Sequence, residues 1–249
     1  MQPAGRVGRC LLMALTIAAL AGCSTVSSTS PMEAASNQTL AFYPGLVKGF
    51  EHSYPPRRML VLAVTDACAN NGASSPQDST PGQQIGVTLD ASGAKIQRLY
   101  VTDMATTVQK ALEQAVQEAG MIASTSAEST YIPQPVDADY VLQSKIVKCW
   151  VRKQRVIDND RNGSWQTVAE FALDATIYKP PFHVPFWQGI SSETYSDPPD
   201  NPGLIPEDTA SIYDEPGEVL SVAFTRSVEG LFKRSDLRSL IIQDRALRH

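Results

Sequence analysis

Apolar and polar positions along the chain follow two periods, one typical of helices and one typical of strands. From Met104 to Ala119, apolar residues recur every three to four positions, which predicts an amphipathic helix. Thr102 or Asp103 is expected to cap its N-terminus, and Gly120 stands where a left-handed C-terminal cap is usual. A chain segment with one apolar face requires a partner layer, so this helix is expected to pack on a sheet.

A second helical pattern follows Pro216. Proline is tolerated at the first position of a helix, so the helix is expected to begin at this residue. Its apolar face runs through Leu220, Phe224 and Leu231. Ser235 is expected to open a short last helix.

Strand patterns occupy the remaining apolar segments. The continuous apolar run 59–65 predicts a strand buried on both faces. Residues 139–178 predict a long antiparallel hairpin, with turn chemistry at Asn162-Gly163 and a change of phase near Ile146-Val147 that indicates a bulge. A further strand is expected from Phe186 to Tyr195.

The order of these elements predicts an α+β fold. We expect a mostly antiparallel sheet with the two main helices packed on one side. Long loops rich in proline and glycine are expected at 67–84 and 196–216.

The N-terminus has the three parts of an export signal. Arg6 and Arg9 precede an apolar run at 11–20, which is only about half as long as a membrane-spanning helix requires. The run ends in Leu20-Ala21-Gly22-Cys23, which resembles the lipobox of bacterial lipoproteins. The resemblance implies a signal peptide over 1–22 and acylation of Cys23, with the acyl chains anchoring the protein to a membrane.

The residues after the cysteine define the expected domain organisation. Ser24 stands where an aspartate commonly retains lipoproteins at the inner membrane, so the resemblance favours the periplasmic face of the outer membrane. The polar stretch 23–39 is expected to be a flexible tether. A single α+β domain is expected over 40–234, followed by a short helix and tail over 235–249.

Composition excludes some partners and leaves the state of two cysteines open. The formal net charge is −5 and no stripe of lysine and arginine occurs, so nucleic acid is not an expected partner. Cys68 and Cys149 lie in the expected domain. They form either a disulfide, as the periplasm permits, or two buried free thiols.

No motif predicts catalysis, a metal or a cofactor. Asp158, Asp160 and Asn162 match the opening of a calcium loop, but Ala169 stands where a bidentate glutamate is needed, so a hairpin turn explains the same residues. His183 lies in a proline-rich loop with no evident partner, and neither a nucleophile elbow nor a phosphate-binding glycine loop occurs. The sequence therefore predicts a protein that is not an enzyme.

Phe182, Phe186 and Trp187 form an aromatic group within this proline-rich region. Aromatic side chains on a stiff loop can serve as interface anchors, so they are candidates for contact with a partner. The alternative is that they cap one end of the core.

Several segments together resemble small envelope lipoproteins with a fold like the N-terminal domain of TolB, including ABC-type transport auxiliary and YajG-like lipoproteins. The segments are the lipobox, the run 59–65, the helix end at 117–120, the strand opening 138–142 and the Trp187-Gln188-Gly189 strand. The resemblance covers about residues 55–234. It implies a non-enzymatic accessory of an envelope transport system that handles lipids or similar amphiphiles within a protein complex.

A second interpretation is a structural or activator lipoprotein for polysaccharide export or cell-wall synthesis. Such a protein could form a ring, so a homo-oligomer stays open as a prediction. Fold resemblance does not decide between the two functions.

Overall fold

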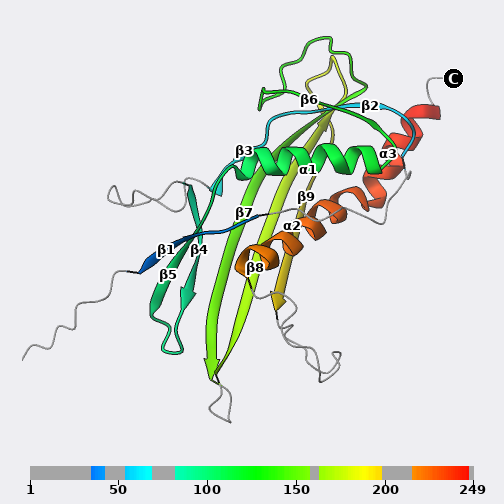
Figure 1. The fold of residues 1–249 in the computed structure, drawn as a ribbon. Helices are drawn as coiled ribbons and strands as arrows, with labels where there is room; N and C mark the ends of the chain where they lie inside the picture. The colour runs from blue at the N-terminus through cyan, green and yellow to red at the C-terminus, as the bar shows by residue number, and fades with distance from the viewer. Residues whose placement is uncertain (1–34, 43–53, 69–81, 158–162, 198–214, 247–249) are drawn as a thin grey trace, which may run out of the picture. The chain divides into compact units, whose positions relative to one another are not determined.

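The computed structural model describes residues 35–42, 54–68, 82–157, 163–197 and 215–246. Over these residues the chain forms nine strands and three helices (Figure 1). The strands are β1 (Ser36–Thr39), β2 (Arg58–Val61), β3 (Thr65–Asp66), β4 (Gln83–Leu89), β5 (Lys95–Val101), β6 (Ile122–Thr125), β7 (Tyr140–Ile157), β8 (Gly163–Tyr178) and β9 (Pro185–Asp197). The helices are α1 (Met104–Glu118), α2 (Pro216–Phe232) and α3 (Ser235–Ala246).

The long hairpin of β7 and β8 forms the centre of the sheet. The two strands pair antiparallel along their whole length, and β9 continues the antiparallel order beyond β8. The register shifts between Ile146 and Lys148, which confirms the predicted bulge. The alternating arm of β8 buries Phe171, Leu173 and Ala175 on the face toward the helices, as its period of two requires.

The sheet is mixed, and the prediction of a mostly antiparallel sheet was wrong. β2, β3 and β4 all pair parallel with β7, and β2 also pairs parallel with β6. Since β8 occupies one edge of β7, these three strands share the other edge in succession. α1 lies in the connection that returns the chain from β5 to β6, and a helical crossover of this kind is what parallel neighbours require.

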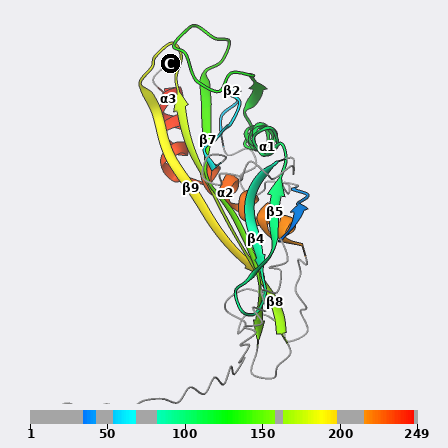
Figure 2. The same ribbon diagram turned by 90° about the vertical axis from the view of Figure 1, so that its left-hand side faces the viewer.

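Helices α1 and α2 lie across one face of the sheet, as Figures 1 and 2 show from two directions. α1 contacts β2, β3 and β6, whereas α2 contacts β7, β8 and β9. The core between the layers includes Val108, Leu112, Phe171 and Phe224, and the Phe171 and Phe224 rings meet edge to face at 5.0 Å. An α+β fold with its main helices on one side is therefore confirmed.

The C-terminal end of α1 agrees with the predicted cap, whereas its N-terminal end does not. Gly120 has a φ of 92°, so it provides the expected left-handed residue after the helix. Asp103 precedes the helix with a φ of 52° and makes no side-chain capping hydrogen bond, and its backbone carbonyl accepts from Thr107 instead. The predicted side-chain cap at Asp103 was therefore wrong, because the left-handed backbone replaces the extended geometry that a capping side chain needs.

The first strand lies inside the segment predicted as tether. Ser36–Thr39 pairs parallel with β5, and the amide of Leu40 donates to the carbonyl of Tyr100 at 2.7 Å. The prediction that the tether continues to residue 39 needs correction at its last four positions. A polar edge strand is held by backbone hydrogen bonds, so its side chains carry no hydrophobic pattern.

The apolar run 59–65 forms two short strands instead of one. Val61 and Leu62 are buried, but pairing with β7 stops after Val61 and resumes at Thr65. The amide of Leu62 donates to Leu142, while the amide of Ala63 donates to Glu128. The chain therefore changes partner in mid-run, which apolar periodicity alone does not reveal.

Candidate binding groove

A groove of about 860 Å³ lies between the N-terminal edge of the sheet and one stripe of α2. Ligand sites in proteins commonly enclose about 300–1,000 Å³. The lining residues come from two short chain segments and successive turns of the helix: Gln38, Thr39, Leu40, Ala41, Glu215, Gly217, Glu218, Ser221, Val222, Thr225, Arg226 and Glu229.

The helical period explains why α2 presents this stripe. Positions 218, 222, 225 and 229 lie on one side of the helix, while Leu220, Phe224 and Leu231 are buried in the core. The side chains of Leu40 and Val222 provide apolar surface in the groove. The sequence pattern assigned this side of α2 to solvent and gave no sign of a groove, because its other wall is the polar strand β1.

Gly217 allows the chain to pass close to the first turn of α2. A Cβ at this position would lie 2.1 Å from the carbonyl oxygen of Ala41, which no side chain could tolerate without a backbone shift. The two segments that line the groove are therefore in direct backbone contact at Ala41 and Gly217.

Charge in the groove is mainly negative. Glu215 and Glu218 are exposed at the start of α2, and Glu229 is half-buried about three turns further along the helix. Lys233 binds Glu229 at 2.9 Å, and the guanidinium of Arg226 stacks on the Tyr195 ring at 4.6 Å. The end of the groove near Glu215 and Glu218 thus favours a positively charged group on a ligand.

The two hydroxyl groups that α2 places in the groove are satisfied within the helix. Ser221 donates to the carbonyl of Gly217 at 2.7 Å, and Thr225 donates to the carbonyl of Ser221 at 2.8 Å. Such bonds hold a hydroxyl against its own helix. The α2 wall of the groove is therefore suited to binding by shape and charge, because the hydroxyls of Ser221 and Thr225 are held against their own helix.

The three residues of the predicted aromatic interface lie in different environments. Trp187 is only 6% exposed, and its indole nitrogen donates to Asp236 at 3.1 Å. Phe186 packs on Tyr140 with ring centroids 5.4 Å apart. These two residues close one end of the core, so their assignment to an exposed interface is corrected. Phe182 is 61% exposed in the loop before β9 and remains a candidate.

Val184, at 69% exposure, joins Phe182 on this loop, which contains a cis peptide bond between Pro180 and Pro181. His183 lies between them and is exposed. The loop is separate from the groove, since it shares none of the groove's lining residues.

Cys68 and Cys149 lie next to one another as free thiols. Cys68 follows β3 and is half-buried, whereas Cys149 is buried in β7. Burial raises the pKa of both thiols, and that of Cys149 lies well above its ordinary value. Neither thiol contributes to the groove.

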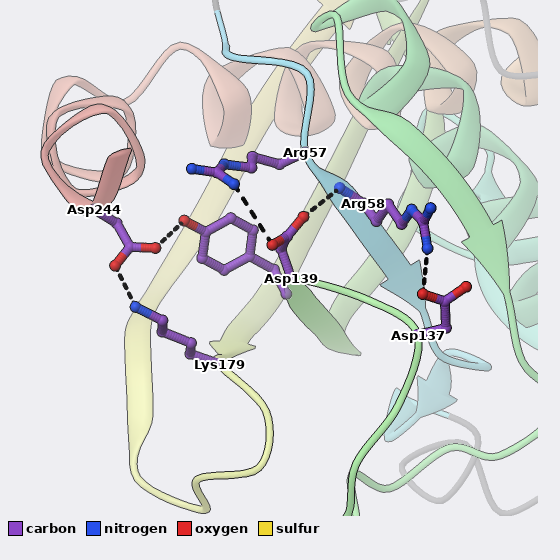
Figure 3. A network of polar contacts seen from close by, with 7 residues as sticks. Arg57, Arg58, Asp137, Asp139, Lys179 and Asp244 are labelled. Atoms are coloured by element: carbon purple, nitrogen blue, oxygen red, sulfur yellow. Dashed lines mark hydrogen bonds and ion pairs between the residues drawn. The ribbon is translucent and has the colours of Figure 1, made fainter. Parts of the chain in front are cut away.

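A network of polar contacts joins β2, β7, β8 and α3 (Figure 3). Arg57 lies 3.7 Å from Asp139, and the Arg58 side chain pairs with Asp137. Asp244 accepts from the Tyr140 hydroxyl and pairs with Lys179. Asp244 is only 7% exposed, so its contacts with Tyr140 and Lys179 fasten α3 to the sheet.

Other sequence predictions fall outside the described residues. These are the acylation of Cys23, the signal peptide, most of the tether, and the calcium-like residues Asp158, Asp160 and Asn162. Among the described residues, no three metal-ligating side chains gather at one point. None of the three helices has the length and apolar character needed to cross a membrane within this part of the chain.

No family model matches the chain, and no curated protein matches its sequence. A Xanthomonas campestris protein assigned to DUF330 is 11% identical, covers 86% of this chain and 100% of its own, and has a TM-score of 0.43. A putative neuraminyllactose-binding hemagglutinin homolog from Helicobacter pylori is 9% identical, with 84% and 100% covered and a TM-score of 0.41. The lipoprotein GNA1162 of Neisseria meningitidis is 15% identical, with 60% and 90% covered and a TM-score of 0.26. Likenesses at these TM-scores assign neither a family nor an activity to the chain.

Proposed function

We propose that this protein is a lipid-anchored component of the bacterial cell envelope that binds an amphiphile without converting it. Cys23 carries the acyl chains, and the folded unit lies on the periplasmic face of the outer membrane. The protein acts there as an accessory of an envelope transport system. The groove between β1 and α2 is the observation that carries this proposal.

The groove combines the two surfaces that an amphiphile needs. Leu40, Ala41 and Val222 accommodate an apolar chain, while Glu215 and Glu218 attract a positively charged head group. Its wall at β1 follows directly on the tether in the sequence, so the groove belongs to the part of the folded unit nearest the anchor along the chain.

Binding is tested with the detergent-extracted full-length protein and two fluorescent probes of equal chain length, a long-chain amine and a long-chain fatty acid. We expect saturable binding of both probes and tighter binding of the amine. Equal affinity for the two probes would remove the assigned role of the carboxylates, and the absence of saturable binding would refute the groove as an amphiphile site.

Two variants locate the probe. Val222→Trp fills the groove and should weaken binding of both probes about tenfold or more, the equivalent of about 1.4 kcal/mol. Ile190→Trp is the matched control, since Ile190 is exposed on β9 away from the groove. If both tryptophan variants bind like the parent protein, the probe occupies another site.

The charge contribution is measured with Glu215→Gln and Glu218→Gln together. Exposed charge pairs contribute up to about 1 kcal/mol each, so affinity for the amine should fall several-fold while affinity for the fatty acid stays the same or rises. Glu113→Gln on α1 is the matched control, because Glu113 does not line the groove.

The transport role itself is tested by crosslinking the acylated protein in its native membranes and identifying the captured proteins by mass spectrometry. Subunits of a transporter would support the accessory role. Capture of wall synthases or polysaccharide-export proteins, or of further copies of this chain alone, would favour a structural role instead.

A further inference from the structure

We propose that Cys68 and Cys149 form a disulfide that joins the end of β3 to the middle of β7. The inference starts from the shared edge of β7. β3 pairs there with Lys145 and Ile146, and β4 pairs with Val151–Gln154. Cys149 lies in the interval between these two pairings, where the edge of β7 carries no strand partner among the described residues.

Cys68 faces this same interval. The amide of Ala67 donates to the carbonyl of Ile146 at 3.1 Å, so the chain still follows β7 one residue beyond β3. The next side chain, that of Cys68, has its Sγ 3.8 Å from the same carbonyl oxygen. Cys68 interacts electrostatically with both the backbone and the thiol of Cys149, which places the two residues beside one another.

Neighbouring strands bring their Cα atoms to a separation that a disulfide can span. Strands in a sheet lie about 4.7–4.9 Å apart, and disulfides join Cα atoms about 4.4–6.8 Å apart. Cys149 belongs to the buried core, and Cys68 packs against that core, so both side chains lie on the core side of the sheet. The bulge after Ile146 shifts the register of β7 immediately before Cys149.

Formation of the bond is a two-electron oxidation. Each thiol loses its proton, the two sulfurs join, and the electron pair reduces the disulfide of an exchange partner such as oxidised glutathione or a periplasmic protein disulfide to two thiols. Because burial raises the pKa of both groups, the bond is expected to form during folding and to resist exchange once the core has closed.

The deciding experiment is peptide mapping of the full-length chain, reduced in denaturant and refolded in a buffer of oxidised and reduced glutathione, then alkylated and digested with trypsin. Cys149 falls on the four-residue peptide 149–152, and Cys68 falls on the peptide 59–95. Cys10 and Cys23 lie together on the peptide 10–48, so neither can be mistaken for the proposed pair. A linked peptide containing 149–152 and 59–95 is expected. Both cysteines alkylated on separate peptides would refute the bond.

Thermal unfolding provides a second measurement that does not depend on digestion. Cys68→Ala, Cys149→Ala and the double variant should lower Tm by similar amounts, because each removes the same bond. Reductant should lower the Tm of the parent protein and leave that of the double variant unchanged. Additive losses that are insensitive to reductant would instead show two independent buried thiols.

This proposal needs an oxidising compartment in the cell and so rests on export, which belongs to the proposed function. The same peptide map of protein recovered from cells separates the two. A bond formed on refolding but absent from cellular protein would contradict export while supporting the pairing, and its absence from both would overturn the pairing itself.

Discussion

The hydroxyl of Tyr140 donates a hydrogen bond of 2.8 Å to Oδ2 of Asp244, which connects the first residue of β7 to the last turns of α3. Lys179 pairs with the other oxygen of the same carboxylate (Figure 3). The helix also buries Leu237 and Ile241 in the core. α3 is therefore fixed at both its apolar face and its polar end.

Replacement of Tyr140 by phenylalanine tests the importance of this bond. The change removes one donor from a buried carboxylate, and a hydrogen bond to a charged group contributes about 1.5–3 kcal/mol. We expect the free energy of unfolding, measured with urea, to fall by about that amount. Tyr178→Phe is the control, since Tyr178 stacks on Tyr131 with ring centroids 4.7 Å apart, and an equal loss in both variants would contradict the assignment.

The stability of the fold should depend on the ionisation of Asp236. Hydrogen bonds from Arg234 and then from Trp187 lower the pKa of this carboxyl group to about 2. A carboxyl whose pKa is lower in the folded chain than in the unfolded chain stabilises the fold above the unfolded pKa of about 3.9 and loses this effect as the pH falls through the folded value.

Thermal unfolding between about pH 4 and pH 2 measures this contribution. The Tm of the parent protein should fall more steeply over this interval than that of Asp236→Asn, which cannot titrate. The difference should be small, because the Asp236 side chain is half-exposed. Parallel profiles for the two proteins would argue against the contribution.

The structure predicts a large loss of stability on replacing Trp187 and almost none on replacing Phe182. Trp187→Ala should lower the free energy of unfolding by about 3–5 kcal/mol, because it empties a buried site. Phe182→Ala should change it by less than about 0.5 kcal/mol, since this ring is exposed.

Substitutions in the loop before β9 test partner contact separately from folding. If the loop before β9 contacts a partner, Phe182→Ala and Val184→Ala should reduce crosslinking in native membranes at unchanged Tm. Unchanged crosslinking in both variants would exclude this loop as the contact.

Gly86 is expected to be among the least tolerant positions in the sheet. A Cβ there would lie 2.0 Å from the carbonyl oxygen of Val151, across the pairing of β4 with β7. Gly86→Ala should therefore lower the free energy of unfolding by more than about 2 kcal/mol. Gly93→Ala offers a comparison: a Cβ at Gly93 meets no neighbour, and its φ of 85° alone should cost about 1 kcal/mol.

Membrane attachment should depend on a single sulfur atom. Cys23→Ser prevents thioether acylation, so the variant should move from the membrane pellet to the soluble fraction after cell fractionation, as two or more acyl chains are lost. Cys10→Ser is the control and should leave the protein in the pellet. A Cys23→Ser variant that still sediments with membranes would refute anchoring through this residue.

The elements with a strong period could be predicted from the sequence, whereas their pairing could not. The helix at Met104 and the alternation along β8 each bury one face, so their type follows from local spacing. The parallel placement of β2, β3 and β4 on β7 depends on contacts between residues far apart in the chain, and no local pattern encodes it.

The groove was less accessible to prediction than the fold. Its residues Glu218, Ser221 and Thr225 have the composition of an ordinary solvent-facing helix side. Only the approach of Ala41 to Gly217 converts that side into a wall, and the approach is a tertiary contact. Cys68 and Cys149, in contrast, could be paired as candidates from the sequence because few cysteines occur in the chain.

The shared edge of β7 determines the order in which the chain can fold as it emerges N-terminus first. The parallel pairings of β2, β3 and β4 with β7 require residues 140–157, and only the pairings of β2 with β6 and of β4 with β5 can form earlier. Met59 and Val61 therefore lack their partners on β7 until more than half of the chain has appeared. Pairings of this kind form slowly, and the exposed segment is prone to aggregation in the interval. A chaperone that holds the N-terminal third of the chain would therefore have the greatest effect before β7 arrives, and little effect afterwards.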